Sequence, residues 1–245
     1  MDTENTMNQN PLTAYVELEI RKENTTAKQW VALWAERALD AWHHEPETLA
    51  YEAMISVEDN SRILIFERYA NGITSIQAHM ARPSHKALES AIGESRMTRR
   101  VVRNVVASDI PSYGWWSRPD RPRQTDGRTI GGALVAVFGA RFGDTTKREA
   151  FVELSGQHGK YCWDAEPDTL TYSGGLTTPE GSRAEEVEPG DLVFLMEATN
   201  EAAMTKHAQD PAHIALGPVM AERGVKMEMT FQGYYKTTGT GFMCR

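Results

Sequence analysis

The stretch Glu45-Pro46-Glu47-Thr48-Leu49-Ala50-Tyr51 decides the fold, because it returns 121 residues later as Glu166-Pro167-Asp168-Thr169-Leu170-Thr171-Tyr172. A second echo follows in the same order, since HMARPSHKAL at 79–88 matches HAQDPAHIAL at 207–216. Between these echoes, the apolar run that ends in Glu67 matches the run that ends in Glu197. Matches in one order over nearly the whole chain indicate a tandem duplication of one domain.

Each half shows the same order of predicted elements. In the first half, apolar and polar residues alternate over 15–21, as in a half-buried strand, and apolar residues share one helix face over 26–42. The other first-half elements are strands at 49–56, 62–69 and 101–108 and helices at 73–81 and from Pro83 onward. The second-half equivalents are 133–141, 147–157, 170–175, 192–199, 201–208 with 212–220, and 225–232.

The order β-α-β-β-α-β is the ferredoxin-like arrangement, so the sequence predicts an α+β protein of two tandem domains. We place the first domain at 13–117 and the second at 133–236. Residues 118–132, rich in Pro, Arg, Gly and Asp, read as the linker. The ends, 1–12 and 237–245, are predicted to be flexible tails.

Composition excludes several partner classes. The net charge of -8 and the pI near 5.4 argue against nucleic acid or an anionic membrane surface. No run of 18 apolar residues could span a bilayer, and 1–11 lacks the apolar core of a secretory signal. Cys162 and Cys244 form no disulfide framework, so we expect a reduced, cytoplasmic chain.

Cofactor signatures are missing from the sequence. It contains no dinucleotide-binding loop, P-loop, HExxH helix or zinc-like Cys/His spacing. We therefore expect neither a metal nor an organic cofactor.

These motifs resemble the antibiotic biosynthesis monooxygenase family of dimeric α/β barrels. The family pattern is E-P-G-x-L-x-Y, a strand ending in E-x-W or E-x-Y, and H-x-x-S-P-x-H, and both halves carry versions of it. The resemblance implies that two sheets pair into one barrel, here within a single chain, and leaves open whether two chains form a homodimer.

The resemblance also implies a cofactor-independent monooxygenase. Its substrate would be a small aromatic, quinol or polyketide-like compound that is deprotonated and reacts directly with O2. A cofactor-free isomerase or cyclase with the same His and Glu groups is one alternative. A binding barrel without turnover is another.

The candidate site consists of acid-base and aromatic side chains of both halves. A histidine of the second helix could act as the base or could tie the helix to the sheet, and a strand-end glutamate could orient that histidine or be solvated. The tyrosines and tryptophans could bind a flat substrate or fill the core. The candidate catalytic residues are His79, Glu67, Tyr69, His207 and Glu197, and the candidate substrate-binding residues are Tyr51, Trp30, Trp34, His85, Tyr172 and His213.

The two halves differ in their aromatic residues. Tyr69 is matched by Thr199, and the Trp30/Trp34 face is matched by Phe151 and Leu154. The family's strand-end Trp is absent from both copies. We expect the more aromatic first half to hold the pocket.

Overall fold

The computed structural model describes residues 10–120, 124–125, 128–129, 131–179 and 184–245. Parts of the predicted 1–12 tail and 118–132 linker lie outside these residues. None of the described helices is both long enough and apolar enough to cross a membrane.

Each half is a β-α-β-β-α-β unit, with the second helical position split into shorter helices. The first half contains β1 (Leu12–Ile20), α2 (Ala27–His44), β2 (Thr48–Ser56), β3 (Arg62–Tyr69), α3 (Gly72–Ala81), α4 (Pro83–Ser95) and β4 (Thr98–Trp115). The second half contains β7 (Leu134–Phe142), α5 (Thr145–Ala165), β8 (Thr169–Thr177), β9 (Leu192–Ala198), α6 (Glu201–Gln209), α7 (Pro211–Ile214), α8 (Leu216–Glu222) and β10 (Met227–Thr237). Two short strands, β5 (Gln124–Thr125) and β6 (Arg128–Thr129), pair between the halves. The predicted duplicated α+β fold is confirmed.

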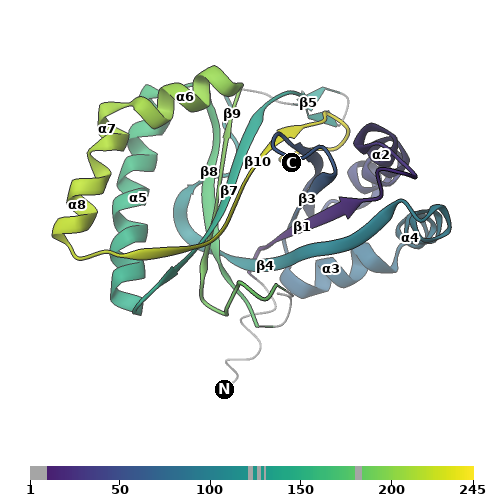
Figure 1. Ribbon diagram of the computed structural model, residues 1–245, viewed down its shortest axis with the longest axis horizontal. Helices are drawn as coiled ribbons and strands as arrows, with labels where there is room; N and C mark the ends of the chain where they lie inside the picture. Colours follow the sequence, from purple (N-terminus) through teal and green to yellow (C-terminus); the bar gives the residue numbers. More distant parts are fainter. Residues whose placement is uncertain (1–9, 121–123, 126–127, 130, 180–183) are drawn as a thin grey trace.

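The eight long strands form one closed barrel in the order β1-β3-β2-β10-β7-β9-β8-β4. The last strand of each half pairs with the second strand of the other, β4 with β8 and β10 with β2. The helices lie outside the barrel, with α2 to α4 on one side and α5 to α8 on the other (Figure 1). Closure within one chain removes the exposed sheet edges that a single half would present, and no second chain is needed for it.

Strand alternation separates two kinds of core. The barrel interior combines side chains of both halves, including Tyr15, Phe66, Val137 and Leu195. The opposite face of the sheet packs against the helices, mainly those of the same half, but Tyr113 of β4 packs with the second-half cluster and Phe242 with the first-half cluster. A site that faces the helices is therefore built mainly from one half.

Helix α5 is longer than the sequence predicted. It begins at an N-cap, where the side chain of Asp144 accepts from the backbone N–H of Lys147, and it runs on to Ala165 rather than ending at residue 157. Its additional turns contain His158 and Cys162, both buried. The extension brings two side chains into the site that the sequence analysis did not consider.

The prediction of a flexible tail at 237–245 is wrong. Glu52 is fully buried and accepts hydrogen bonds from the backbone N–H groups of Thr238, Gly239 and Gly241, at 2.9, 3.1 and 2.8 Å. Phe242, also buried, pairs with Tyr51 through the backbone. The C-terminal segment is held because it satisfies a buried carboxylate of the first half.

Candidate active site

An apolar cavity lies in the second half, between α5, the helices α6 to α8 and the sheet. Its volume is about 400 Å³, within the range of small-molecule sites. Three polar side chains reach its wall, those of Ser155, His207 and His213. The aromatic residues of the lining are Phe138, Phe151, Tyr172 and Phe194.

The cavity exists because a serine replaces a tryptophan. Glu45 and Glu166 are equivalent, because each caps the C-terminus of its helix, α2 or α5. Counting back along the helices from these caps places Ser155 at the position of Trp34. The indole Nε1 of Trp34 donates to Tyr51 Oη at 2.9 Å, and Ser155 Oγ lies 2.8 Å from Tyr172 Oη. Trp34 is 1% exposed and fills its half, whereas the small Ser155 makes the equivalent contact and leaves space. The predicted match of the tryptophan face to Leu154 is corrected by one residue.

His207 is held by a carboxylate at the end of α5. Its Nδ1 lies 2.8 Å from Glu166 Oε2, which also accepts from Thr169 Oγ1 at 2.9 Å. Burial opposes the charged carboxylate, but the hydrogen bond and charge of His207 outweigh it and lower the pKa of Glu166 to about 2. Because an ionised carboxylate only accepts, Nδ1 carries a proton and Nε2 remains for other chemistry.

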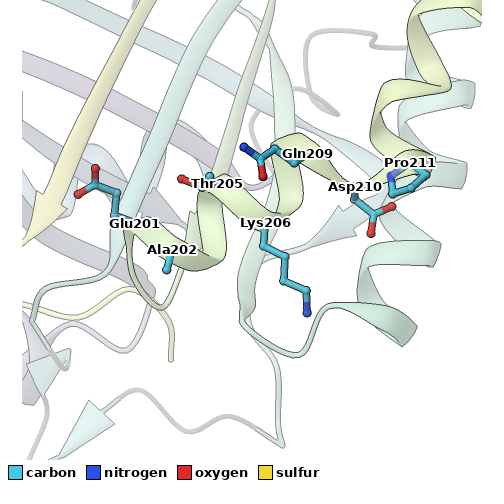
Figure 2. Close-up of a pocket in the computed structure, with 7 residues that line it drawn as sticks. All are labelled: Glu201, Ala202, Thr205, Lys206, Gln209, Asp210 and Pro211. Atoms are coloured by element: carbon cyan, nitrogen blue, oxygen red, sulfur yellow. The ribbon is translucent and has the colours of Figure 1, made fainter.

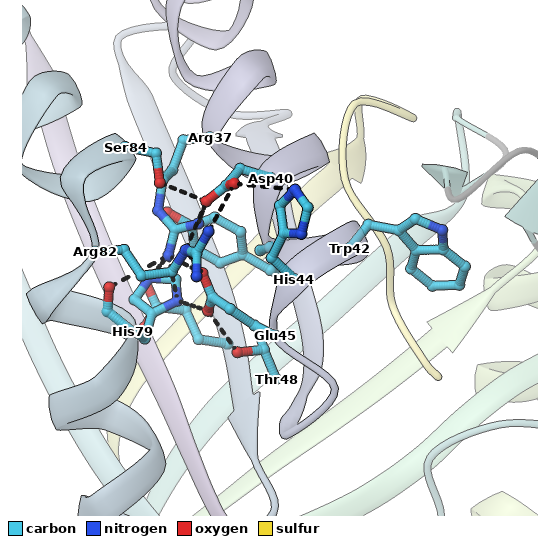
Figure 3. Close-up of polar contacts among 12 residues, drawn as sticks. Arg37, Asp40, Trp42, His44, Glu45, Thr48, His79, Arg82 and Ser84 are labelled. Carbon is cyan, nitrogen blue, oxygen red and sulfur yellow. Dashed lines mark hydrogen bonds and ion pairs between the residues drawn. The ribbon is translucent and has the colours of Figure 1, made fainter.

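The first half contains the same pair in a different electrostatic setting. His79 Nδ1 lies 2.7 Å from Glu45 Oε2, but Arg37 Nη2 lies 2.6 Å from Glu45 Oε1. Arg82 reaches the same carboxylate at 3.2 Å and also binds Asp40 (Figure 3). Two guanidinium groups thus neutralise the carboxylate that His79 contacts.

The second half replaces both arginines. His158 stands at the position of Arg37, and Asp210 stands at that of Arg82. Asp210 accepts from Tyr161 Oη at 3.0 Å. The Glu166 carboxylate therefore pairs with His207 without a guanidinium at either of these two positions.

A chain of hydroxyl groups borders the cavity. Ser155 Oγ lies 2.8 Å from both Tyr113 Oη and Tyr172 Oη. Tyr172 Oη also donates to the backbone carbonyl of Ser155 at 3.2 Å. Tyr113 belongs to β4 and so comes from the first half of the chain. Such hydroxyls can donate to an oxygen atom on which negative charge develops.

Three groups near His207 are able to bind a metal. Cys162 Sγ lies 3.4 Å from His158 Nε2 and 3.7 Å from His207 Nδ1. Burial, together with the neighbouring histidines, lowers the pKa of His158 to about 4, and burial raises the pKa of the Cys162 thiol. His213 Nδ1 lies 3.3 Å from His158 Nε2.

The structure brings the first-half candidates together, but as a packed core. The rings of Tyr51, Tyr69 and His85 lie 4.9, 5.4 and 5.0 Å from that of His79, measured between centroids. Tyr69 Oη donates to Glu67 Oε2 at 2.7 Å, and burial raises the pKa of Glu67. Trp30 and Trp34 are buried beside this cluster. Around His79 the tryptophans occupy the space that corresponds to the second-half cavity.

Glu67 and Glu197 are not equivalent, although the sequence pattern matched them. Tyr51 pairs with Glu67 across β2 and β3, whereas Tyr172 pairs with Met196 across β8 and β9. Glu197 therefore faces the barrel interior, where it accepts from Thr171 Oγ1 at 3.1 Å, away from the cavity. Strand alternation explains the difference, because a shift of one residue moves a side chain to the other face. By the same register, Ala198 rather than Thr199 matches Tyr69.

A larger depression follows the outer surface of α6 (Figure 2). Its lining includes exposed polar side chains such as Glu201, Thr205 and Lys206. It is open to solvent and contains no buried polar group, so the cavity beside His207 is the better candidate site.

Several residues of the site were missed by the sequence analysis. Glu45 and Glu166 were visible as an invariant part of the repeated motif, but only the strand-end glutamates were considered as partners of the histidines. His158 and Cys162 have the i, i+4 spacing of one helix face. That signal was lost because the helix was expected to end at residue 157.

Comparisons with known proteins agree with this fold. Residues 11–90 match the sequence profile of the antibiotic biosynthesis monooxygenase family. No curated protein sequence matches the chain.

Solved structures of similar length share the whole tandem architecture. A proposed monooxygenase from Fusobacterium nucleatum is 10% identical, with a TM-score of 0.70 over 98% of this chain and 96% of that one. A proposed monooxygenase from Lactobacillus acidophilus is 11% identical, with a TM-score of 0.66 over 96% and 99%. An anthrone oxidase-like protein is 12% identical, with a TM-score of 0.59 over 94% and 92%. At these identities the likeness concerns the fold alone. The first half of the chain is therefore a domain of the antibiotic biosynthesis monooxygenase family, and the second half repeats its fold.

Proposed function

We propose that the chain is a cofactor-independent monooxygenase whose working site is the cavity of the second half. The observation that carries this proposal is the His207–Glu166 pair at the wall of an aromatic-lined cavity. The family profile supports the reaction class, although it matches the other half. The aromatic lining favours a small, flat phenolic or enolisable substrate over a sugar or a phosphate.

The chemistry begins with proton transfer. His207 Nε2 removes a proton from an activated CH2 or hydroxyl group of the substrate, and Glu166 stabilises the imidazolium that forms. The hydroxyls of Ser155 and Tyr172 donate to the substrate oxygen that becomes negatively charged. The substrate anion supplies electrons to O2, so that a CH2 group becomes C=O while the second oxygen atom leaves as water.

The first half serves as scaffold in this proposal. Its buried ionic cluster and packed tryptophans hold α2 to α4 on the barrel, and β4 contributes Tyr113 to the hydroxyl chain. Cys162 and Cys244 are not joined in a disulfide, in keeping with the reducing cytoplasm that we expect as the compartment.

Oxygen uptake with a panel of anthrones and hydroquinones tests the proposal. We expect His207→Ala to lower kcat/KM by about 10²- to 10⁴-fold, as for loss of a general base. The matched first-half variant His79→Gln should retain turnover per folded molecule. Turnover that continues unchanged without oxygen would contradict a monooxygenase and select an isomerase or cyclase. Substrate binding without any His207-dependent turnover would select a binding barrel.

A further inference from the structure

A compact set of metal-binding side chains adjoins the cavity. The ligand atoms of His158, Cys162 and His207 all lie within 4.8 Å of one another, and the three residues are buried. His158 and Cys162 are one turn apart on α5, and His207 comes from α6, which packs beside it. Two helices therefore fix the three groups without any loop.

The spacing suits a tetrahedral ion. Zinc lies about 2.3 Å from sulfur and about 2.0–2.1 Å from nitrogen, which puts neighbouring ligand atoms about 3.3–3.6 Å apart. The Cys162 sulfur lies 3.4 Å from His158 Nε2 and 3.7 Å from His207 Nδ1. These two separations match those of a tetrahedral ion, and the third, between His158 and His207, is at most 4.8 Å.

The charges around the set also favour a cation. In the first half the corresponding positions hold Arg37 and Ala41, so a fixed positive charge already neutralises Glu45. In the second half they hold His158 and Cys162, and the Glu166 carboxylate contacts His207 Nδ1 and accepts from Thr169 Oγ1. A thiolate and a carboxylate together would balance a divalent cation in a buried place, which lowers the cost of desolvating each charge.

We propose that His158, Cys162 and His207 bind a divalent cation of the zinc type. On binding, the Cys162 thiol releases its proton to solvent and sulfur bonds to the ion. For a neutral His207 ring, the proton on Nδ1 moves to Nε2, and Nδ1 becomes the ligand. Glu166 Oε2, 2.8 Å from Nδ1, then faces the ion and is nearest to complete the coordination. The inference goes beyond the proposed oxygenation and does not depend on it. With the ion bound, His207 Nε2 carries a proton and is no base, so the proposed oxygenation belongs to the ion-free protein.

Binding of Zn²⁺ and Co²⁺ to the full chain, without substrate and under anaerobic, reducing conditions, tests the site. Isothermal titration should give one Zn²⁺ per chain, because the first half lacks the cysteine and one histidine. Co²⁺ should produce intense visible bands of tetrahedral coordination and a near-ultraviolet thiolate band. Zn²⁺ should also raise Tm, since the ion binds the folded state.

The first half supplies substitutions that this fold already accommodates. Cys162→Ala and His158→Arg introduce the residues found at the equivalent positions. Cys162→Ala should abolish the thiolate band, and each variant should weaken Zn²⁺ binding by more than about 100-fold. This loss exceeds the effect of removing a hydrogen-bond partner of a metal ligand. Cys244→Ala, the matched control for the other thiol, should bind Zn²⁺ unchanged.

Two outcomes would overturn the metal site. One is Zn²⁺ binding no tighter in the wild type than in Cys162→Ala. The other is a Co²⁺ spectrum that persists in Cys162→Ala and disappears in Cys244→Ala. Oxygenation is measured separately on chelator-treated protein, where His207 is unligated. Failure of one proposal therefore leaves the other intact.

Discussion

At Trp34 and Ser155 the two halves place different side chains against equivalent tyrosines. Both residues hydrogen-bond the tyrosine, but only the indole occupies the volume between helix and sheet. A buried aromatic side chain accounts for a large share of local packing, so its replacement by serine leaves a cavity unless neighbours collapse. Here Phe138, Phe151 and Phe194 line the space instead of closing it.

Restoring the tryptophan tests the functional cavity at the level of one residue. We expect Ser155→Trp to abolish ligand binding and turnover, because the indole fills the space as in the first half. Stability should stay within about 1 kcal/mol of the wild type or rise, since the added apolar surface is buried. Ligand titration and urea unfolding measure the two effects. Ser155→Ala keeps the cavity open but removes a hydroxyl of the proposed site, so it should still bind ligand while its turnover falls. Full turnover in Ser155→Trp would place the site elsewhere.

Sequence alone named His207 among the candidates but gave preference to the half whose helix–sheet space the tryptophans fill. Counting aromatic residues favoured the first half, and that count treated Trp30 and Trp34 as a binding surface. In the folded chain they are core, because the face of α2 that carries them turns inward. Whether an aromatic residue lines a cavity or fills it depends on its neighbours across the sheet, which local sequence does not specify.

At the scale of elements, the order of helices and strands could be predicted, because periodicity and turn residues are local. The register of strand pairing could not be predicted. The apolar runs that end in Glu67 and Glu197 look alike, yet Tyr51 of β2 pairs with Glu67, whereas the equivalent Tyr172 of β8 pairs with Met196. Cross-strand packing decides that register, and it moves Glu197 to the barrel interior.

The ionic cluster between α2, α3 and α4 provides a prediction for the first half. Arg37→Met would leave the Glu45 carboxylate buried without the guanidinium that lies 2.6 Å away. We expect a loss of about 3–5 kcal/mol in the free energy of unfolding, as when one partner of a buried ion pair is removed. His158→Met, at the equivalent position of α5, should cost less because its ring bears no fixed charge. Equal losses in urea unfolding would contradict the structural role of Arg37.

At the scale of the whole molecule, the two seams of the barrel differ. In the seam between β10 and β2, the ladder is short, with Tyr235, Lys236 and Thr237 in register with Ser56, Ile55 and Met54. The C-terminal segment continues past this seam and binds Glu52 and the backbone of Tyr51. The short seam is thus reinforced by residues that follow the second domain, so closure of the barrel depends on them.

Glu52 should make that closure sensitive to pH. Burial raises the pKa of Glu52 to about 7 from its usual value of 4.5, although backbone N–H groups of the C-terminal segment lower it in part. Because the folded pKa lies above the unfolded one, the folded chain keeps a proton that the unfolded chain loses between these values. With respect to this group, the free energy of unfolding is therefore greatest below pH 4.5. It falls by at most about 3 kcal/mol as the pH rises to 7, and it is constant above that pH.

Glu52→Gln removes the titrating group, so its stability relative to the wild type should rise by about 1–3 kcal/mol between pH 5 and pH 8 in urea unfolding. Limited proteolysis of the wild type should cut the C-terminal segment faster at pH 8 than at pH 5 after correction for protease activity. A stability difference that stays constant over this range would show that Glu52 keeps its charge throughout and that the donors of the C-terminal segment outweigh its burial.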